Sequence, residues 1–114
     1  MRKDDLIRIR HMIGAARDAM GFIAGRSRED LDRDRMLVLS LVKSVEILGE
    51  AASKISEDLR REQPAFPWRE MVAMRNRLIH GYFDINLDIV WQTVREEMPA
   101  LVADLEAILA AEEK

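Results

Sequence analysis

The stretch RDRMLVLSLVKSVEILGEAASKISEDLRR, residues 33 to 61, decides the fold of this chain. Its apolar residues recur at intervals of three and four, the spacing that places side chains on one face of an α-helix. The members of this stripe are Leu37, Leu41, Val45, Leu48, Ala52, Ile55 and Leu59. Neighbouring apolar residues such as Val38 and Ile47 widen the face. The pattern predicts one long helix from about Arg33 to Arg61, central in a bundle or shared with a second subunit.

A second amphipathic segment lies near the start of the chain and is expected to begin near Asp4. Gly25 is the expected stop of this helix, because glycine adopts the left-handed backbone that ends helices. Ser27 is expected to cap a new helix with an acid three residues later, and this helix is expected to start with a kink. The apolar stripe of the first segment consists of Ile9, Met12, Ile13, Ala16, Met20 and Ile23.

Two further helices are expected after Pro64 and Pro67. The first should run from Trp68 to His80, with Gly81 as its stop. Asn86 is expected to cap the second, and Pro99 should kink or restart it. No segment shows the alternation of a half-buried strand. The predicted fold is all-α: an up-and-down bundle of four to five helices in one domain, residues 1–114.

The composition excludes several function classes. The chain has no cysteine, which removes disulfides, thiolate nucleophiles and cysteine-based metal sites. The net charge of −3 argues against a protein that coats polyanions over its whole surface, although a local basic site around Arg69, Arg75 and Arg77 remains open. No apolar run approaches the roughly 20 residues needed to span a bilayer, and no leader segment is evident. We expect a cytoplasmic protein without membrane contact.

The segment RNRLIHGY, Arg75 to Tyr82, concentrates the polar chemistry of the chain. It combines a fixed cation, an amide, an imidazole and a phenol within eight positions. On a continuous helix Asn76 and His80 would share a face, whereas Arg75 and His80 would diverge by about 140°. A structural interpretation stays open from these residues alone, because a His followed by Gly is a common way to end a helix. Tyr82 would then be an ordinary core aromatic.

The same segment resembles the HEPN superfamily, in which an Arg, usually followed by a polar residue, precedes a His by four to six positions. The His-Gly-Tyr ending is similar to the HepT-like toxin branch, whose motif adds a Tyr two residues after the His. Three other stretches resemble this branch in the same order along the chain: Ile47–Ala52 (ILGEAA), Phe66–Arg69 (FPWR) and Ile89–Trp91 (IVW).

This resemblance implies a HEPN-like helical bundle that dimerises and cleaves RNA without a metal or another cofactor. It also implies regulation by a partner, an MntA-like nucleotidyltransferase antitoxin that adds AMP to the motif tyrosine. Carried over by residue, it assigns Arg75 and His80 as catalytic, Asn76 as supporting and Tyr82 as the modified residue. The implied function is a metal-independent ribonuclease toxin of a toxin–antitoxin pair.

The residues themselves suggest how such a site would work. RNA can supply its own 2′-hydroxyl as nucleophile, but the reaction needs a base, an acid and a cation for the charged transition state. His80 suits the first two roles, while the second histidine, His11, is expected far away in the first helix. A homodimer with facing motifs would supply two copies of His80 and Arg75. Glu46 or Glu50 could pair with an arginine of the motif.

Two alternatives remain at this stage. The chain could be a non-catalytic helical partner of a nucleotidyltransferase, using Arg75 and His80 to bind a nucleotide or substrate phosphate. It could also be a structural dimerisation bundle, which explains the apolar stripes but leaves the polar cluster as coincidence. Cleavage of RNA in EDTA, and its loss in His80→Ala, would separate the enzyme from both.

Overall fold

The computed structural model describes residues 1–80 and 84–112, and within them the chain is helical. Within these residues the β-type pairing consists of one isolated antiparallel bridge, between Ile79 and Ile85. The predicted all-α fold is confirmed. The helices are α1 (Lys3–Ile23), α2 (Asp30–Arg33), α3 (Arg35–Ser53), α4 (Glu57–Glu62), α5 (Trp68–Leu78), α6 (Leu87–Gln92), the π-helical turn η1 (Thr93–Glu97) and α7 (Met98–Glu112).

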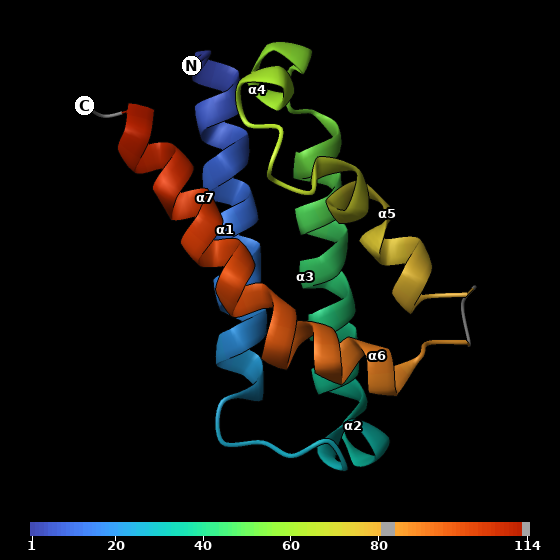
Figure 1. Cartoon of the computed structure of the whole chain (residues 1–114). Coiled ribbons are helices and arrows are strands. Elements are labelled where there is room, and N and C mark those ends of the chain that lie inside the picture. The colour runs from blue at the N-terminus through green and yellow to red at the C-terminus, as the bar shows by residue number, and fades with distance from the viewer. Residues whose placement is uncertain (81–83, 113–114) are drawn as a thin grey trace.

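The helices form an up-and-down bundle measuring 45 × 28 × 20 Å (Figure 1). α1 and α3 run side by side in opposite directions, and α5 packs against α3. α6, η1 and α7 form one bent rod, which returns across α3 and packs along α1. The short helices α2 and α4 lie in the connections at the two ends of α3. Four main rods therefore make up the bundle, as the sequence predicts.

The first helix closely follows its prediction. It begins at Lys3 and ends at Ile23, and Gly25 adopts a φ of 73°, a backbone conformation that side chains with a Cβ rarely take. The predicted stop is confirmed. Of the predicted stripe, Met20 is half-buried and the other members are buried: Ile9, Met12, Ile13, Ala16 and Ile23. This stripe contributes the α1 side of the core.

The predicted kink before the long helix is a complete break at Asp34. Its backbone is extended, and its carboxylate accepts a hydrogen bond from the amide of Leu37 at 3.0 Å, so Asp34 caps α3. Ser27 does not cap the preceding α2; its amide instead donates to the carboxylate of Asp30 at 2.8 Å. The Leu37 amide and the Arg26 guanidinium, which pairs with Asp34, lower the pKa of the Asp34 carboxyl.

The prediction of one helix from Arg33 to Arg61 is wrong at its far end, because α3 stops at Ser53. The cause is a buried carboxylate on α1. Asp5 is 2% exposed and accepts hydrogen bonds from both the amide and the hydroxyl of Ser56, at 2.9 and 2.6 Å. Ser56 also caps α4 by accepting from the amide of Leu59. Ile55 and Leu59 remain buried, so the apolar stripe is correct although the helix is interrupted.

Both predictions for the last rod, the cap at Asn86 and the restart at Pro99, are confirmed. The Asn86 side chain caps α6 by accepting from the backbone amide three residues on, at 3.1 Å. Pro99 lacks an N–H group and its ring crowds the carbonyl one turn earlier. The wider π-helical turn accommodates this, with the Met98 amide bonded to the Thr93 carbonyl, and α7 restarts at Met98. Among the described helices, none combines the length and apolar character that crossing a membrane requires.

Candidate active site

Helix α5 carries the arginines of the motif and packs against α3. Its inner face buries Met71, Met74 and Leu78, which follow the helical spacing. Gly49 on α3 lies at this contact: a Cβ at its position would be in ordinary van der Waals contact with the carbonyl oxygen of Met71, at 3.4 Å, so a larger side chain would not fit without a shift. Trp68 anchors the start of α5 by donating its indole N–H to the carbonyl of Gln63 at 2.9 Å. The position of α5 on α3 is thus fixed by packing.

The end of α5 differs from the prediction. The helix stops at Leu78, and Ile79 adopts an extended backbone with φ −127° and ψ 118°. The His80 amide donates to the carbonyl of Asp84 at 2.7 Å, and the Asn86 amide donates to the carbonyl of Leu78 at 2.9 Å. The extended conformation buries Ile79 and pairs backbone groups that the helix end would leave unsatisfied. Gly81, the predicted stop, lies outside the described residues.

Because His80 lies beyond the helix, the expectation that Asn76 and His80 share a helix face is wrong. The 140° divergence expected between Arg75 and His80 likewise no longer applies. Both Asn76 and His80 are exposed, and the backbone pairing with Asp84 presents His80 to solvent just past the end of α5. Tyr82, the predicted modification site, also lies outside the described residues.

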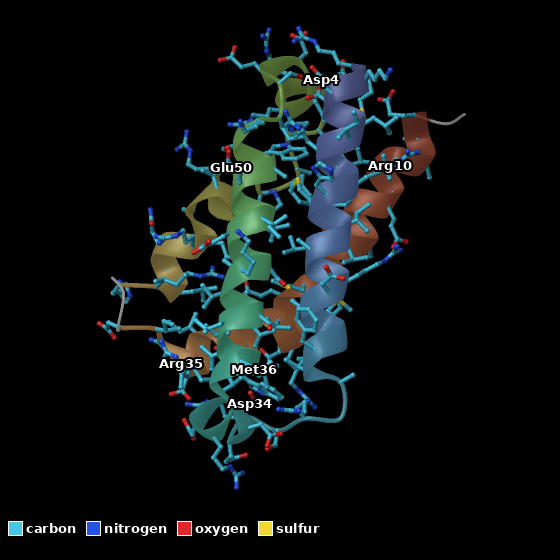
Figure 2. All side chains as sticks on the ribbon, turned by 180° about the vertical axis from the view of Figure 1, so that it is seen from behind. Asp4, Arg10, Asp34, Arg35, Met36 and Glu50 are labelled. Carbon is cyan, nitrogen blue, oxygen red and sulfur yellow. The ribbon has the colours of Figure 1, made fainter. Side chains whose placement is uncertain are left out.

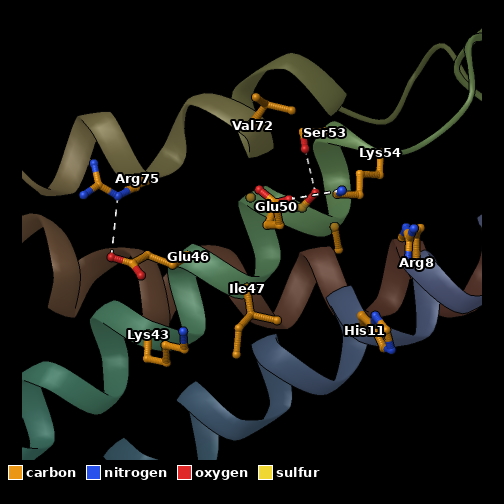
Figure 3. Close-up of a pocket in the computed structure, with 12 residues that line it drawn as sticks. Arg8, His11, Lys43, Glu46, Ile47, Glu50, Ser53, Lys54, Val72 and Arg75 are labelled. Atoms are coloured by element: carbon orange, nitrogen blue, oxygen red, sulfur yellow. Dashed lines mark hydrogen bonds and ion pairs between the residues drawn. The ribbon is translucent and has the colours of Figure 1, made fainter.

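Arg75 points towards α3 and borders a pocket (Figure 3). Its Nε lies 3.5 Å from Oε1 of Glu46, one of the ion pairs that the sequence left open. Glu50 pairs instead with Lys54 on its own segment, at 3.4 Å. The pocket has a volume of about 640 Å³ and lies between α1, α3 and α5. His80 is not among the described residues that line it.

Arg77 belongs to a different contact. Its Nη2 lies 3.2 and 3.3 Å from the two carboxylate oxygens of Glu97 and 3.4 Å from the hydroxyl of Thr93, both on η1. Arg69 is exposed and does not line the pocket. The basic site expected from Arg69, Arg75 and Arg77 is therefore not one cluster in space, since only Arg75 of the three borders this pocket.

The sequence predicts His11 in the first helix, far from the motif, and the structure places it on α1. His11 lines the same pocket as Arg75, at its other end, where Arg8 lies one helical turn away on α1 (Figure 3). Lys43 on α3 and Lys54, the residue after its end, add two cations. Sequence reasoning missed these residues because it followed the apolar stripe of each helix. A signal was present, since the charged residues Lys43, Glu46, Glu50 and Lys54 recur at intervals of three and four.

Metal ligands are a separate question. Within residues 1–80 and 84–112, no three or more His, Asp or Glu side chains lie close enough together to hold a metal ion. What the described site offers is a guanidinium beside a carboxylate, an exposed imidazole after the helix end and an exposed amide one residue after the arginine. A guanidinium suits a phosphate group, and an imidazole can accept or donate a proton near neutral pH.

Comparisons with known proteins identify the family of this chain. A family model described as "Ribonuclease HepT-like" matches residues 12–108. A protein of Caldanaerobacter subterraneus subsp. tengcongensis, assigned as an RNase, is 38% identical over 90 residues, covering 79% of this chain and 80% of the relative. A protein of Thermococcus cleftensis, assigned as ribonuclease HepT, is 39% identical over 80 residues, covering 70% and 73%.

A third relative, from Methanocaldococcus jannaschii and also assigned as an RNase, is 32% identical over 97 residues, covering 85% of this chain and 89% of the relative. No solved structure gives a significant match to the chain. The family match spans most of the bundle and includes Arg75, Asn76, His80 and Tyr82. The chain therefore belongs to the HepT-like family of the HEPN superfamily.

Proposed function

We propose that this protein is a metal-independent ribonuclease, the cytoplasmic toxin of a toxin–antitoxin pair. The observation that carries the proposal is the placement of Arg75 and His80 in a chain of the HepT-like family. Arg75 borders an open pocket, and His80 is exposed directly after α5. The relatives assigned as RNases support RNA as the substrate.

The proposed reaction uses the RNA's own 2′-hydroxyl. A base removes its proton, the oxygen attacks the adjacent phosphorus, and the bond to the 5′-oxygen breaks. An acid protonates the departing oxygen, which leaves a 2′,3′-cyclic phosphate and a 5′-hydroxyl. Arg75 would hold the phosphate through its Nη groups, since its Nε faces Glu46. Asn76 would position the substrate or the imidazole.

The acid and the base would come from two copies of His80 across a two-fold dimer. Within one protomer, His11 is the competing source of a second imidazole, because it lines the Arg75 pocket. Mixed dimers of wild type and His80→Ala test the composite site, with His11→Ala homodimers as the matched control. We expect the mixed dimers to lose most of their cleavage and His11→Ala to retain it. The reverse result would assign the second proton transfer to His11.

Tyr82 would serve as the control point. An MntA-like nucleotidyltransferase would join the phenol oxygen to the α-phosphorus of ATP and release pyrophosphate. The added AMP carries negative charge and bulk close in sequence to His80, where an RNA phosphate must approach. Tyr82→Phe is expected to cleave RNA but to escape silencing by the nucleotidyltransferase and ATP. Unchanged silencing of Tyr82→Phe would contradict this assignment.

The basic activity is tested with purified protein and an RNA oligonucleotide in excess EDTA. Cleavage is expected to continue in EDTA and to fall at least about a hundredfold in His80→Ala, as the loss of a general acid or base does. Folding of the variant is checked by circular dichroism. A protein that binds RNA or nucleotide tightly but does not cleave RNA would support the alternative, a non-catalytic binding partner of a nucleotidyltransferase.

A further inference from the structure

The pocket beside Arg75 extends well beyond the motif. Figure 3 shows Arg75 and Lys43 at one end, with Lys54, Arg8 and His11 towards the other. α1 and α3 lie in front in Figure 2, so this side of the bundle is not covered by α7. The volume of about 640 Å³ falls within the range of ligand sites in proteins. Of the described residues of the motif, Arg75 lines this pocket, and it lies at one end.

The charge of the lining contrasts with the charge of the chain. The pocket is lined by four permanent cations, Arg8, Lys43, Lys54 and Arg75, and by two carboxylates. The whole chain carries a net charge of −3. An excess of positive charge in a hollow of an acidic protein attracts anions locally while the remaining surface repels them. The lining therefore favours an anionic ligand.

The cations of this pocket are available to such a ligand. Arg8 and Lys43 form no ion pair with any residue that the structure describes. The pairs of Lys54 with Glu50 and of Arg75 with Glu46 are partly exposed and long, at 3.4 and 3.5 Å. Exposed pairs of this kind contribute little stability. Exchanging a carboxylate partner for a phosphate would therefore cost little.

The length of the pocket points to a strand rather than to a single nucleotide. Lys43 and Lys54 are eleven residues apart along α3 and its end, which corresponds to about 16 Å at 1.5 Å per residue. A stacked nucleic-acid strand advances only about 3.4 Å per nucleotide. Between the two lysines, Ile47 and Val72 are 41% and 39% exposed and offer an apolar surface to sugars or bases.

We propose that this pocket is the binding groove for the RNA strand that flanks the cleaved phosphodiester. The phosphates lie along Lys43, Lys54 and Arg8, and the strand passes over Ile47 and Val72. Recognition is through charge and is independent of sequence. The inference rests on the proposed function, because Arg75 at one end of the groove would hold the reacting phosphate.

A second copy of the chain is a poorer occupant. A two-fold contact centred on this pocket would place the same surface against itself, so four cations would face four others. Interface cores are also depleted in charged residues, whereas charged side chains make up half of this lining. A phosphate strand neutralises the excess positive charge, and a second copy doubles it.

The experiment measures binding of a fluorescent single-stranded RNA to dimeric His80→Ala protein, which removes the proposed cleavage. Lys43→Gln/Lys54→Gln in this background is compared with a charge-matched control outside the groove, Lys3→Gln/Arg10→Gln. At about 50 mM salt the groove variant is expected to bind at least fivefold more weakly, and its slope of log affinity against log salt should fall by about 1.4. The control should change affinity less than about twofold.

Glu50→Gln provides a test of opposite sign. Removing this carboxylate from the groove lining is expected to tighten RNA binding by about two- to fivefold, because one repulsive charge disappears. A purely structural role for these residues would not produce opposite effects from Lys54 and Glu50. Circular dichroism and light scattering check that each variant keeps its fold and its oligomeric state.

Three results would contradict the proposal that this groove binds RNA. They are no measurable RNA binding, equal effects of the groove and control variants, and a changed oligomeric state with unchanged RNA affinity. The last result would assign the surface to a second copy. If the binding changes occur as expected but the wild-type protein does not cleave RNA, the groove stands and the ribonuclease proposal fails.

Discussion

Arg75 and Arg77 lie two residues apart on α5, but their side chains act on opposite sides of the helix. Two residues correspond to a rotation of about 200°. Arg75 faces α3 and pairs with Glu46, whereas Arg77 faces η1 and contacts Glu97 and Thr93. Their side chains are similarly exposed, at 49% and 42%. Exposure therefore does not distinguish the two arginines, and their partners do.

The partners show what each arginine does. Thr93 is fully buried, so the contact of Arg77 connects α5 to the interior of the last rod. Arg75 and its partner Glu46 line an open pocket together with three other cations. The contacts of Arg77 therefore fit a support of the bundle, whereas the position of Arg75 fits the ligand-binding role proposed for it. Neighbouring arginines in a sequence motif can thus have separate roles, and the following variants test that separation.

The largest expected difference is in catalysis. Arg75→Ala should lower kcat/KM for RNA cleavage by about two to three orders of magnitude, as the loss of a transition-state contact does. Arg77→Ala should change it less than about fivefold, because Arg77 contacts η1 and not the pocket. Cleavage of an RNA oligonucleotide under single-turnover conditions measures both. Equal losses in the two variants would show that the arginines act as one unit.

The next effect concerns the close packing that places the Arg75 side of α5 on α3. Gly49→Val adds atoms against the carbonyl oxygens of Met71 and Val72 and should cost about 1–3 kcal/mol in the free energy of unfolding. Gly49→Ala is the control, because its Cβ would make ordinary contacts at 3.4 and 3.6 Å. Urea denaturation measures the costs. Equal stability of the two variants would contradict the close approach.

A smaller effect is expected on the Arg77 side. Thr93→Val keeps the buried shape but removes the hydroxyl that accepts from Arg77 and donates to Glu97. The long distances of 3.4 and 3.3 Å limit the expected cost to about 1 kcal/mol. RNA cleavage by the folded variant should remain within about twofold of wild type. Thr93→Ser, which keeps the hydroxyl, controls for the lost hydrogen bonds.

The smallest effect is expected at the start of α3, where Asp34 caps the helix. The pKa of Asp34 is held below its ordinary value of 3.8 by the Leu37 amide and Arg26. Its ionised form therefore stabilises the fold above pH 3.8, and this contribution is lost as the pH falls through the lowered pKa. Asp34→Asn should retain the cap but unfold with a weaker dependence on acid. Thermal unfolding between neutral pH and the acid range measures this difference.

Much of the fold follows from local signals in the sequence. The stripe of α1, the stop at Gly25, the Asn86 cap and the restart at Pro99 all involve residues close together in the chain. The end of α3 could not be predicted in this way. It depends on Asp5, which lies 51 residues from Ser56, and no periodicity reveals that this carboxylate becomes buried.

The site was predictable in its chemistry but not in its geometry. The motif predicts Arg75 and His80 as the catalytic residues of the candidate site, and Arg75 pairs with Glu46, one of the ion pairs that the sequence left open. The placement of His80 depends on backbone pairing with Asp84, and the position of His11 on the pocket depends on how α1 packs against α3. Such contacts arise from tertiary structure. A helical wheel drawn for α5 alone therefore gives the wrong relation between Asn76 and His80.

The π-helical turn η1 determines how the start of the last rod is rotated relative to its end. A π-helical turn holds one residue more than an α-helical turn, so deleting a residue within Thr93–Glu97 would restore the α-helical register. The chain before the deletion would then rotate by about 100° relative to α7. Asn86 would rotate with it, and its amide is hydrogen-bonded to Leu78 beside His80. The π-helical turn thus sets the rotation of Asn86 relative to α7, and with it the backbone pairing of Asn86 with Leu78 at the end of α5.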